Sequence, residues 1–202
     1  MAQTEAPTKK MTYEEFLAWC DEDTWAEWVD GKVVMLPPVS WLHQDVKGFL
    51  LTILHVYTEQ HNLGEVISAP FQMRLAELQR GREPDVLFVA KEHLNRLTET
   101  YLDGPADVVI EIVFLDSGPR DRGEKYYEYE AAGVREYWLI DPDRQRAEFY
   151  CLNAQKRYDL ILPDAQGVYR SEVIPGFWLK VSWLWQRPLP RVLDVLKELK
   201  LI

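Results

Sequence analysis

The sequence has few of the features that mark several large protein classes. No apolar stretch approaches the roughly 20 residues of a membrane-spanning helix, so we expect no membrane association. Residues 1–10 contain no apolar core that could form a signal peptide, and we expect a flexible tail there and a cytoplasmic protein. The GxGxxG, GK(S/T), GxSxG and HExxH patterns are all missing, which argues against the enzyme classes that depend on them.

Cysteine and positive charge are also scarce. The two cysteines, Cys20 and Cys151, have no cysteine or histidine neighbours at ligand spacing, so we predict reduced thiols rather than a zinc site or a disulfide. The net charge of −10 counts against a protein that binds nucleic acid through a broad basic surface. It leaves room for an enzyme whose basic residues are local, because metal-binding acids themselves add negative charge.

The chain is nevertheless rich in what a folded core needs. Of its residues 47% are hydrophobic and 12% aromatic, which fits a single domain over residues 11–202. A capping box opens a short helix over residues 12–20, and Asp30-Gly31 is a hairpin turn signal. Ser40 can cap a long amphipathic helix over residues 41–61.

Strands and helices alternate in the rest of the chain. Predicted strands cover residues 65–75, 86–89, 107–113, 136–140, 147–152 and 157–161, with a polar turn around Gly81 between the first two. Predicted helices lie near His93, over 122–132 and from about Pro190. Asp121 to Glu124 forms a second capping box for the helix over 122–132, and Gly133 ends that helix. The strands on either side of it should be parallel, with a right-handed crossover. We therefore predict an α/β (α+β) fold: a mixed central sheet flanked by helices, with extra C-terminal strands and a C-terminal helix.

Two acidic residues stand where buried strands are expected. Asp85 precedes the run 86–89, and Glu111 lies inside the run 107–113. Both runs are short and rich in β-branched residues, which indicates strands buried on both faces. A carboxylate there costs several kcal/mol unless a cation pairs with it. On neighbouring strands the two acids can share one Mg²⁺ or Mn²⁺, with the backbone carbonyl of Ile112 as a further ligand.

Basic residues follow the second of these strands. Lys125 is expected in the first turn of its helix, where the helix dipole disfavours a cation, so a functional partner would offset that cost. We predict that Lys125 orients the attacking water and binds phosphate. Arg120 and Arg122 flank the same helix start and are candidate phosphate contacts. Together these residues indicate a metal-dependent phosphoryl-transfer site.

The same residues carry a family resemblance. Pro84-Asp85 followed by Glu111-Ile112-Val113 resembles the PD-(D/E)XK nuclease motif, although Val113 stands at the lysine position of that motif. A longer signature resembles the Uma-type family of restriction endonucleases; it consists of Arg120 to Lys125, Tyr129, Ala132-Gly133-Val134 and Glu136 to Pro142. The resemblance extends from about Tyr13 to the chain's end. It implies a restriction-endonuclease-like core, metal binding by Asp85 and Glu111, and use of Lys125 in place of the missing lysine.

The resemblance also adds two site residues and exposes one departure. Glu27, just before the hairpin turn, matches the acid that many such nucleases add to their metal site, and His43 near the start of the long helix assists. After Val113 the family usually continues with Ser-Pro, whereas this chain has Phe114-Leu115. A bulky ring beside the metal-binding strand would reshape the pocket or lower the activity.

The leading prediction is a Mg²⁺-dependent endonuclease that hydrolyses phosphodiester bonds in DNA and works as a homodimer. The alternative is a weak or inactive protein of the same fold that binds partners or regulates, which Phe114 and the acidity favour. A third interpretation uses the paired carboxylates for acid–base catalysis as in glycosidases, and Lys125 argues against it.

Overall fold

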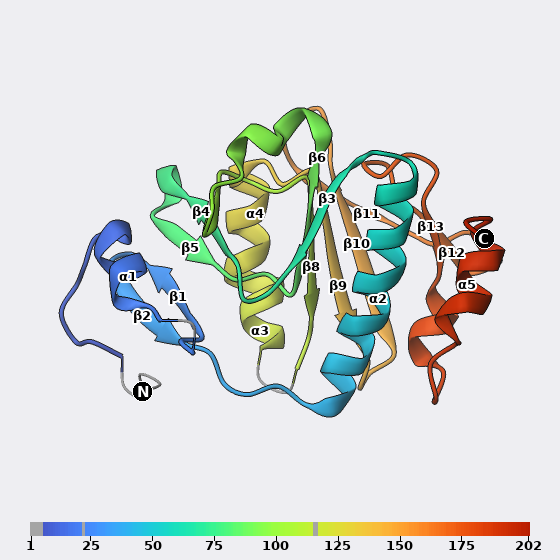
Figure 1. Ribbon diagram of the computed structural model, residues 1–202, viewed down its shortest axis with the longest axis horizontal. Coiled ribbons are helices and arrows are strands. Elements are labelled where there is room, and N and C mark those ends of the chain that lie inside the picture. Colours follow the sequence, from blue (N-terminus) through green and yellow to red (C-terminus); the bar gives the residue numbers. More distant parts are fainter. Residues whose placement is uncertain (1–5, 22, 115–116) are drawn as a thin grey trace.

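The computed structural model describes residues 6–21, 23–114 and 117–202, so residues 1–5 of the predicted tail and Leu115 of the family departure lie outside the described part. The predicted α+β class is confirmed: helices cover both faces of a mixed sheet (Figure 1). Within the described ranges, no helix combines the length and the apolar character needed to cross a membrane. Cys20 and Cys151 are free thiols, as predicted.

The main sheet has six strands in the order β11-β10-β9-β8-β6-β3. Its strands are β3 (Gly64–Ser68), β6 (Val86–Ala90), β8 (Val108–Ile112), β9 (Glu136–Asp141), β10 (Arg146–Leu152) and β11 (Tyr158–Ile161). β8 pairs parallel with β9 and antiparallel with β6, so the predicted parallel pair around one helical segment is confirmed.

A second sheet has five strands in the order β2-β1-β5-β4-β7. Its strands are β1 (Ala26–Val29), β2 (Lys32–Met35), β4 (Gln72–Leu75), β5 (Arg80–Arg82) and β7 (Tyr101–Asp103). The predicted hairpin joins β1 to β2, and Asp30 and Gly31 both have the positive φ that such a turn requires. A separate pair is formed by β12 (Val168–Arg170) and β13 (Trp178–Lys180).

The helices pack around these sheets. They are α1 (Tyr13–Trp19), α2 (Trp41–Gln60), α3 (Gly118–Arg120), the π-helical turn η3 (Asp121–Lys125), α4 (Tyr126–Ala132), α5 (Val192–Glu198) and the short 3₁₀ turns η1 (Ala76–Leu78), η2 (Lys91–Arg96) and η4 (Val181–Trp185). The capping box of α1, the Ser40 cap of α2 and the left-handed Gly133 after α4 all match the prediction.

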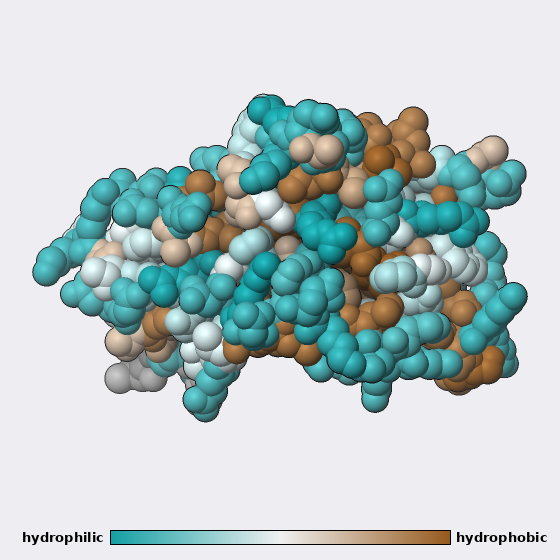
Figure 2. Space-filling view, turned by 90° about the horizontal axis from the view of Figure 1, so that it is seen from above, coloured by the Kyte–Doolittle hydropathy of each residue, from teal (hydrophilic) through white to brown (hydrophobic). Residues whose placement is uncertain are grey.

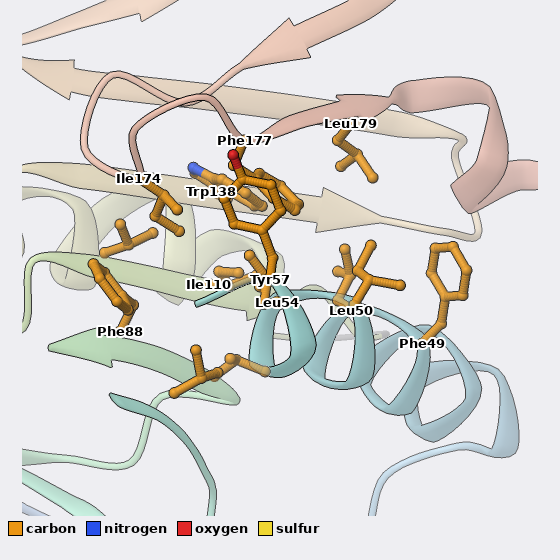
Figure 3. Close-up of a cluster of buried hydrophobic side chains, with 14 of the residues drawn as sticks. Phe49, Leu50, Leu54, Tyr57, Phe88, Ile110, Trp138, Ile174, Phe177 and Leu179 are labelled. Carbon is orange, nitrogen blue, oxygen red and sulfur yellow. The ribbon is translucent and has the colours of Figure 1, made fainter. Parts of the chain in front are cut away.

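The core occupies both faces of the six-stranded sheet. On one face Leu50 and Leu54 of α2 point toward Trp138 of β9, and the C-terminal segment adds Phe177 (Figure 3). On the other face Tyr129 of α4 packs with alternate residues of β6, β8 and β9. The surface seen from above is mainly hydrophilic, with hydrophobic patches that are larger toward the C-terminal side of the molecule (Figure 2). Two buried layers therefore hold β8 rigidly at the centre.

Two local predictions are wrong in the middle of the chain. The single strand predicted over 65–75 is two strands, because the chain leaves the six-stranded sheet at Ala69-Pro70 and continues as β4 in the other sheet. Pro70 has no N–H to donate to a strand ladder, which favours the break. The segment 80–82, predicted as a polar turn, is strand β5 and pairs with both β1 and β4.

The second capping box is also wrong. Asp121 does not cap the helix; it lies inside a continuous helical segment that begins at Gly118 and passes through the π turn η3. Pro119 suits the first helical turn, because its missing N–H is not needed there. Lys125 therefore sits well inside the helical segment, and the helix dipole is not what makes its position unusual.

Candidate active site

The register of the central strands brings Asp85 and Glu111 together. β6 and β8 are antiparallel with Val86 opposite Ile110, so one step further along the ladder sets Asp85 opposite Glu111. Side chains alternate between faces along a strand, and Leu87 and Val109 belong to the core layer on the α4 side. Both acids therefore face the helical segment that carries Lys125, at the end of the sheet where β8 finishes.

Asp85 is held by two elements. Its Oδ2 accepts a hydrogen bond from the Ile112 N–H at 2.8 Å and lies 3.1 Å from Nε2 of His43 on α2. When Nε2 carries the proton, Nδ1 of the neutral ring is an acceptor, and this buried atom has no partner among the described residues.

Lys125 joins three carboxylates. Its Nζ lies 2.7 Å from Oε1 of Glu111, 3.2 Å from Oε1 of Glu27 and 3.7 Å from Oδ1 of Asp121. Glu111 Oε1 also accepts a hydrogen bond from the Tyr129 hydroxyl at 2.8 Å. Glu27 belongs to β1 of the five-stranded sheet and Glu111 to β8 of the six-stranded sheet, so Lys125 connects the two sheets. A π-helical turn is uncommon and is often found at functional sites, and here its two ends carry Asp121 and Lys125.

Burial and the neighbouring charges shift the pKa values of these groups. Burial raises the pKa of Glu111, and the carboxylates of Asp121, Asp85 and Glu27 add to the rise against the opposing charge of Lys125. The pKa of Lys125 is raised because these acids outweigh its burial. Burial also acts to raise the pKa of Glu27, but Lys125 and Arg82 lower it to about 2. The site thus concentrates negative charge that a further cation would stabilise.

A pocket opens in front of these groups. Its volume is about 70 Å³, and its lining includes His43, Lys47, Glu83, Asp85, Glu111, Phe114, Arg120, Asp121 and Lys125. Buried polar atoms without a hydrogen-bond partner gather in the same lining: His43 Nδ1, Glu83 Oε2, Arg120 Nε and Asp121 Oδ1. Such atoms are rare in native proteins, and a water, an ion or a substrate group in the pocket could satisfy them.

The predicted phosphate contacts and the family departure have different surroundings. Arg120 lines the pocket. Arg122 is instead held by Glu148 at 2.8 Å and Asp141 at 3.3 Å, and it is not part of the pocket lining. The Phe114 ring does line the pocket and packs edge-on against His43, with 6.5 Å between ring centroids.

Several site residues escaped the sequence analysis. Arg82 of β5 donates to Glu27 at 2.8 Å and pairs with Glu128, and Tyr129 holds Glu111. Lys47 and Glu83 line the pocket. For Lys47 a signal did exist, because it lies four residues after His43 and therefore on the same face of a helix. Arg82 sits in a segment whose composition predicts a turn, so nothing local marked it.

The donor set suits a cation that keeps most of its waters. Within the described ranges, no group of three or more His, Cys, Asp and Glu side chains is arranged to enclose a metal ion. Asp85 Oδ1 and Glu111 Oε2 accept no hydrogen bond from any described residue, while their other oxygens are held by protein donors. Mg²⁺ is commonly bound by one or two carboxylates together with water and substrate phosphate. Two fixed carboxylates, each with one free oxygen, meet that requirement.

Comparison with known proteins identifies the fold and the family of the chain. A crystal structure described as a putative nuclease belonging to DUF820, from Anabaena variabilis, superposes with a TM-score of 0.71 at 18% identity, over 87% of this chain and 97% of that one, and thus shares the fold. No curated protein matches the chain. The family profile Uma2, described as "Putative restriction endonuclease", matches residues 13–182. The chain is therefore a member of the Uma2 family of restriction-endonuclease-like proteins.

Proposed function

We propose that this protein is a metal-dependent endonuclease that hydrolyses phosphodiester bonds in DNA. The observation that carries the proposal is the convergence of three side chains on one pocket: Asp85 directly before β6, Glu111 in β8 and Lys125 in the helical segment that follows β8. Two carboxylates beside a buried ammonium group supply what phosphodiester hydrolysis needs: a place for a divalent cation and a fixed positive charge. Membership of the Uma2 family supports this reaction class.

Asp85 and Glu111 would hold Mg²⁺ or Mn²⁺ through their free oxygens, with the carbonyl of Ile112 as a further ligand. A cation bound there supplies Lewis-acid stabilisation of the phosphate and a more acidic bound water. The Ile112 N–H and the Tyr129 hydroxyl fix the two carboxylates from behind. Such fixed ligands preorganise a site, since little reorganisation is needed when substrate binds.

Lys125 contributes charge at the reacting group. Its Nζ donates a hydrogen bond to Glu111 and forms ion pairs with Glu27 at 3.2 Å and Asp121 at 3.7 Å. A donor that Glu111 does not engage can serve the attacking water or a phosphate oxygen. His43, oriented by Asp85, can hold a proton at Nδ1, and Arg120 can contact phosphate. Glu27 supports Lys125 from behind, and the surroundings of Arg122 make it the weaker of the two arginine candidates.

Plasmid nicking tests the proposal. Supercoiled plasmid is incubated with Mg²⁺ or Mn²⁺ and wild-type protein, Asp85→Asn, Lys125→Met or the control Asp143→Asn, which changes an exposed turn residue. We expect Asp85→Asn and Lys125→Met to slow nicking by about 100-fold or more, since each removes a group that acts on the reacting phosphate. Asp143→Asn should nick like wild type, and circular dichroism confirms that the variants are folded.

One experimental result would favour the partner-binding alternative over the proposed nuclease function. Phe114 lies in the pocket where the family usually has serine, and this observation favours a weakened enzyme. If wild-type protein binds Mn²⁺ in calorimetry but leaves plasmid and single-stranded DNA intact, the site has lost its catalytic function. If it neither binds the ion nor cleaves, the metal-dependent mechanism is refuted.

We also propose a homodimer, because two copies of one site can cut both strands of a duplex. Analytical ultracentrifugation with and without a short duplex gives the mass directly. A monomer under both conditions would contradict the dimer and leave the nicking mechanism standing.

A further inference from the structure

Lys47 is a buried cation of the pocket that the proposed mechanism does not use. It lies on α2 one turn after His43 and lines the pocket together with Asp85 and Glu111. Only 7% of its surface is exposed. Burial of an ammonium group is costly unless charges or acceptors around it compensate. The partners of Lys47 therefore decide whether it has a purely structural role.

Those partners are too few for a lysine. Its Nζ donates to the carbonyl of Ala69 at 3.2 Å. An ammonium group carries three donors, and in the part of the chain that the structure describes no carboxylate lies within 4.0 Å of this one. Burial lowers the pKa of Lys47, and the more distant Asp85, Glu83 and Glu111 only partly oppose that effect. Two of the three N–H donors of Lys47 thus have no hydrogen-bond acceptor among the described residues, and its positive charge has no carboxylate partner there.

A structural role alone would not need this charge. The Ala69 carbonyl, at the break between β3 and β4, requires one donor, which a neutral amide could supply. Lys125 shows the contrast, since three carboxylates surround that buried ammonium group. Because few anionic groups of the protein surround Lys47, an anion of a bound molecule can pair with it.

Arg120 lines the same pocket from another helix and has the same deficit. Its Nε is buried without a hydrogen-bond partner, and among the described residues no carboxylate pairs with its guanidinium group. Lys47 from α2 and Arg120 from α3 therefore bring two unpaired cations to a pocket that also holds the Asp85 and Glu111 carboxylates. Its volume of about 70 Å³ admits a few waters or one phosphate-sized group.

We infer that Lys47 is a substrate-binding residue that, with Arg120, forms a phosphate subsite beside the two metal-binding carboxylates. This inference rests on the proposed function and names a role for a residue outside it. Lys47 binds a phosphate oxygen through its two free donors while Ala69 fixes its position. The phosphate is thereby held between the cation at Asp85 and Glu111 and the two basic side chains.

Binding without metal separates this role from catalysis. A fluorescent DNA duplex is titrated with full-length wild type, Lys47→Met, Lys47→Arg and Lys91→Met in EDTA over a range of salt concentrations, and anisotropy gives the affinity. Lys91 is an exposed lysine outside the pocket, so its variant controls for the loss of one positive charge. We expect Lys47→Met to bind about tenfold more weakly and to lower the salt dependence of log K by about one. Lys47→Arg should retain most of the affinity for DNA and most of its salt dependence. Lys91→Met should match wild type in both quantities.

The outcomes tell the two proposals apart. If Lys47→Met binds DNA with wild-type affinity and salt dependence, or if Lys91→Met weakens it equally, the role of Lys47 is refuted and the nuclease stands. If wild type neither binds nor cleaves DNA, the proposed nuclease function is refuted. The role of Lys47 is then tested by the binding of inorganic phosphate. A phosphate-dependent rise in Tm that is lost in Lys47→Met supports the subsite, whereas equal rises in both, or none in wild type, overturn it.

Discussion

Replacing Glu27 by glutamine tests the electrostatics of the site through stability. Glu27 is completely buried, and its carboxylate accepts from Arg82 at 2.8 Å and lies 3.2 Å from the Lys125 ammonium group. Burial alone would raise the pKa of this group, but the two cations lower it from 4.5 to about 2. That shift corresponds to about 3 kcal/mol of stability at pH 7, which Glu27→Gln should remove because the amide keeps the shape and loses the charge.

The direction of the pKa shift of Glu27 determines how this stability difference changes with pH. A carboxylate whose pKa is lower in the folded state stabilises the protein above its unfolded pKa, and the stabilisation is lost as pH falls toward the folded pKa. With values of 4.5 and about 2, wild type loses about 2 kcal/mol of this contribution between pH 7 and pH 3. The glutamine variant has no such group to titrate. The difference between the two proteins should therefore shrink from about 3 to about 1 kcal/mol over that range.

Urea denaturation at a series of pH values measures this difference. Glu99→Gln serves as the control, since Glu99 is exposed and makes no ion pair within the described ranges; we expect it to behave like wild type. A difference between wild type and Glu27→Gln that stays constant from pH 7 to pH 3 would show that the variant acts through packing. A Glu27→Gln protein as stable as wild type at pH 7 would refute the ion-pair argument altogether.

Three further predictions concern the pocket, the core and a helix cap. Phe114→Ser removes the ring that lines the pocket and packs against His43, so we expect several-fold faster plasmid nicking; an unchanged or slower rate would show that the ring does not obstruct the site. Leu54→Ala leaves a cavity in the layer between α2 and β9. The free energy of unfolding of this variant, measured in urea, should be lower than that of wild type by about 2–5 kcal/mol, and a loss below about 1 kcal/mol would contradict the prediction. Thr12→Ala breaks the exposed capping box of α1 and should cost about 1 kcal/mol in the same assay; hydrogen exchange faster in α1 than elsewhere would place the loss there.

The sequence predicted the parts of the fold whose signals are local. The amphipathic pattern of α2, the capping box of α1 and the segment from β8 to β9 all depend on spacing within a few turns. The break at Ala69-Pro70 was missed because both halves of that segment are strands, and only the choice of partner strand separates them. Partner choice is a tertiary property that no local pattern records.

The candidate site shows the same limit. Asp85 and Glu111 could be singled out from the sequence because each is an acid at or inside an apolar run, but only the register of β6 and β8 shows that they lie opposite each other. Lys125 was identified for the wrong reason, since its position is explained by Glu27 and Glu111 rather than by a helix end. Arg82 was missed, because the two carboxylates that accept its hydrogen bonds are 46 and 55 residues away in sequence. Contacts of that range become visible only when the two sheets are brought together.

The position of Lys125 between the two sheets has a consequence for how the protein fails. The ammonium group reaches Glu27 in one sheet and Glu111 in the other, and Arg82 of β5 reaches Glu128 on α4 in the same region. A slight separation of the two sheets would scatter these charges while each sheet kept its own hydrogen bonds. Local opening of this kind costs less free energy than global unfolding. If the protein is the nuclease we propose, its catalysis should therefore be the first property lost under mild denaturant, before either sheet unfolds.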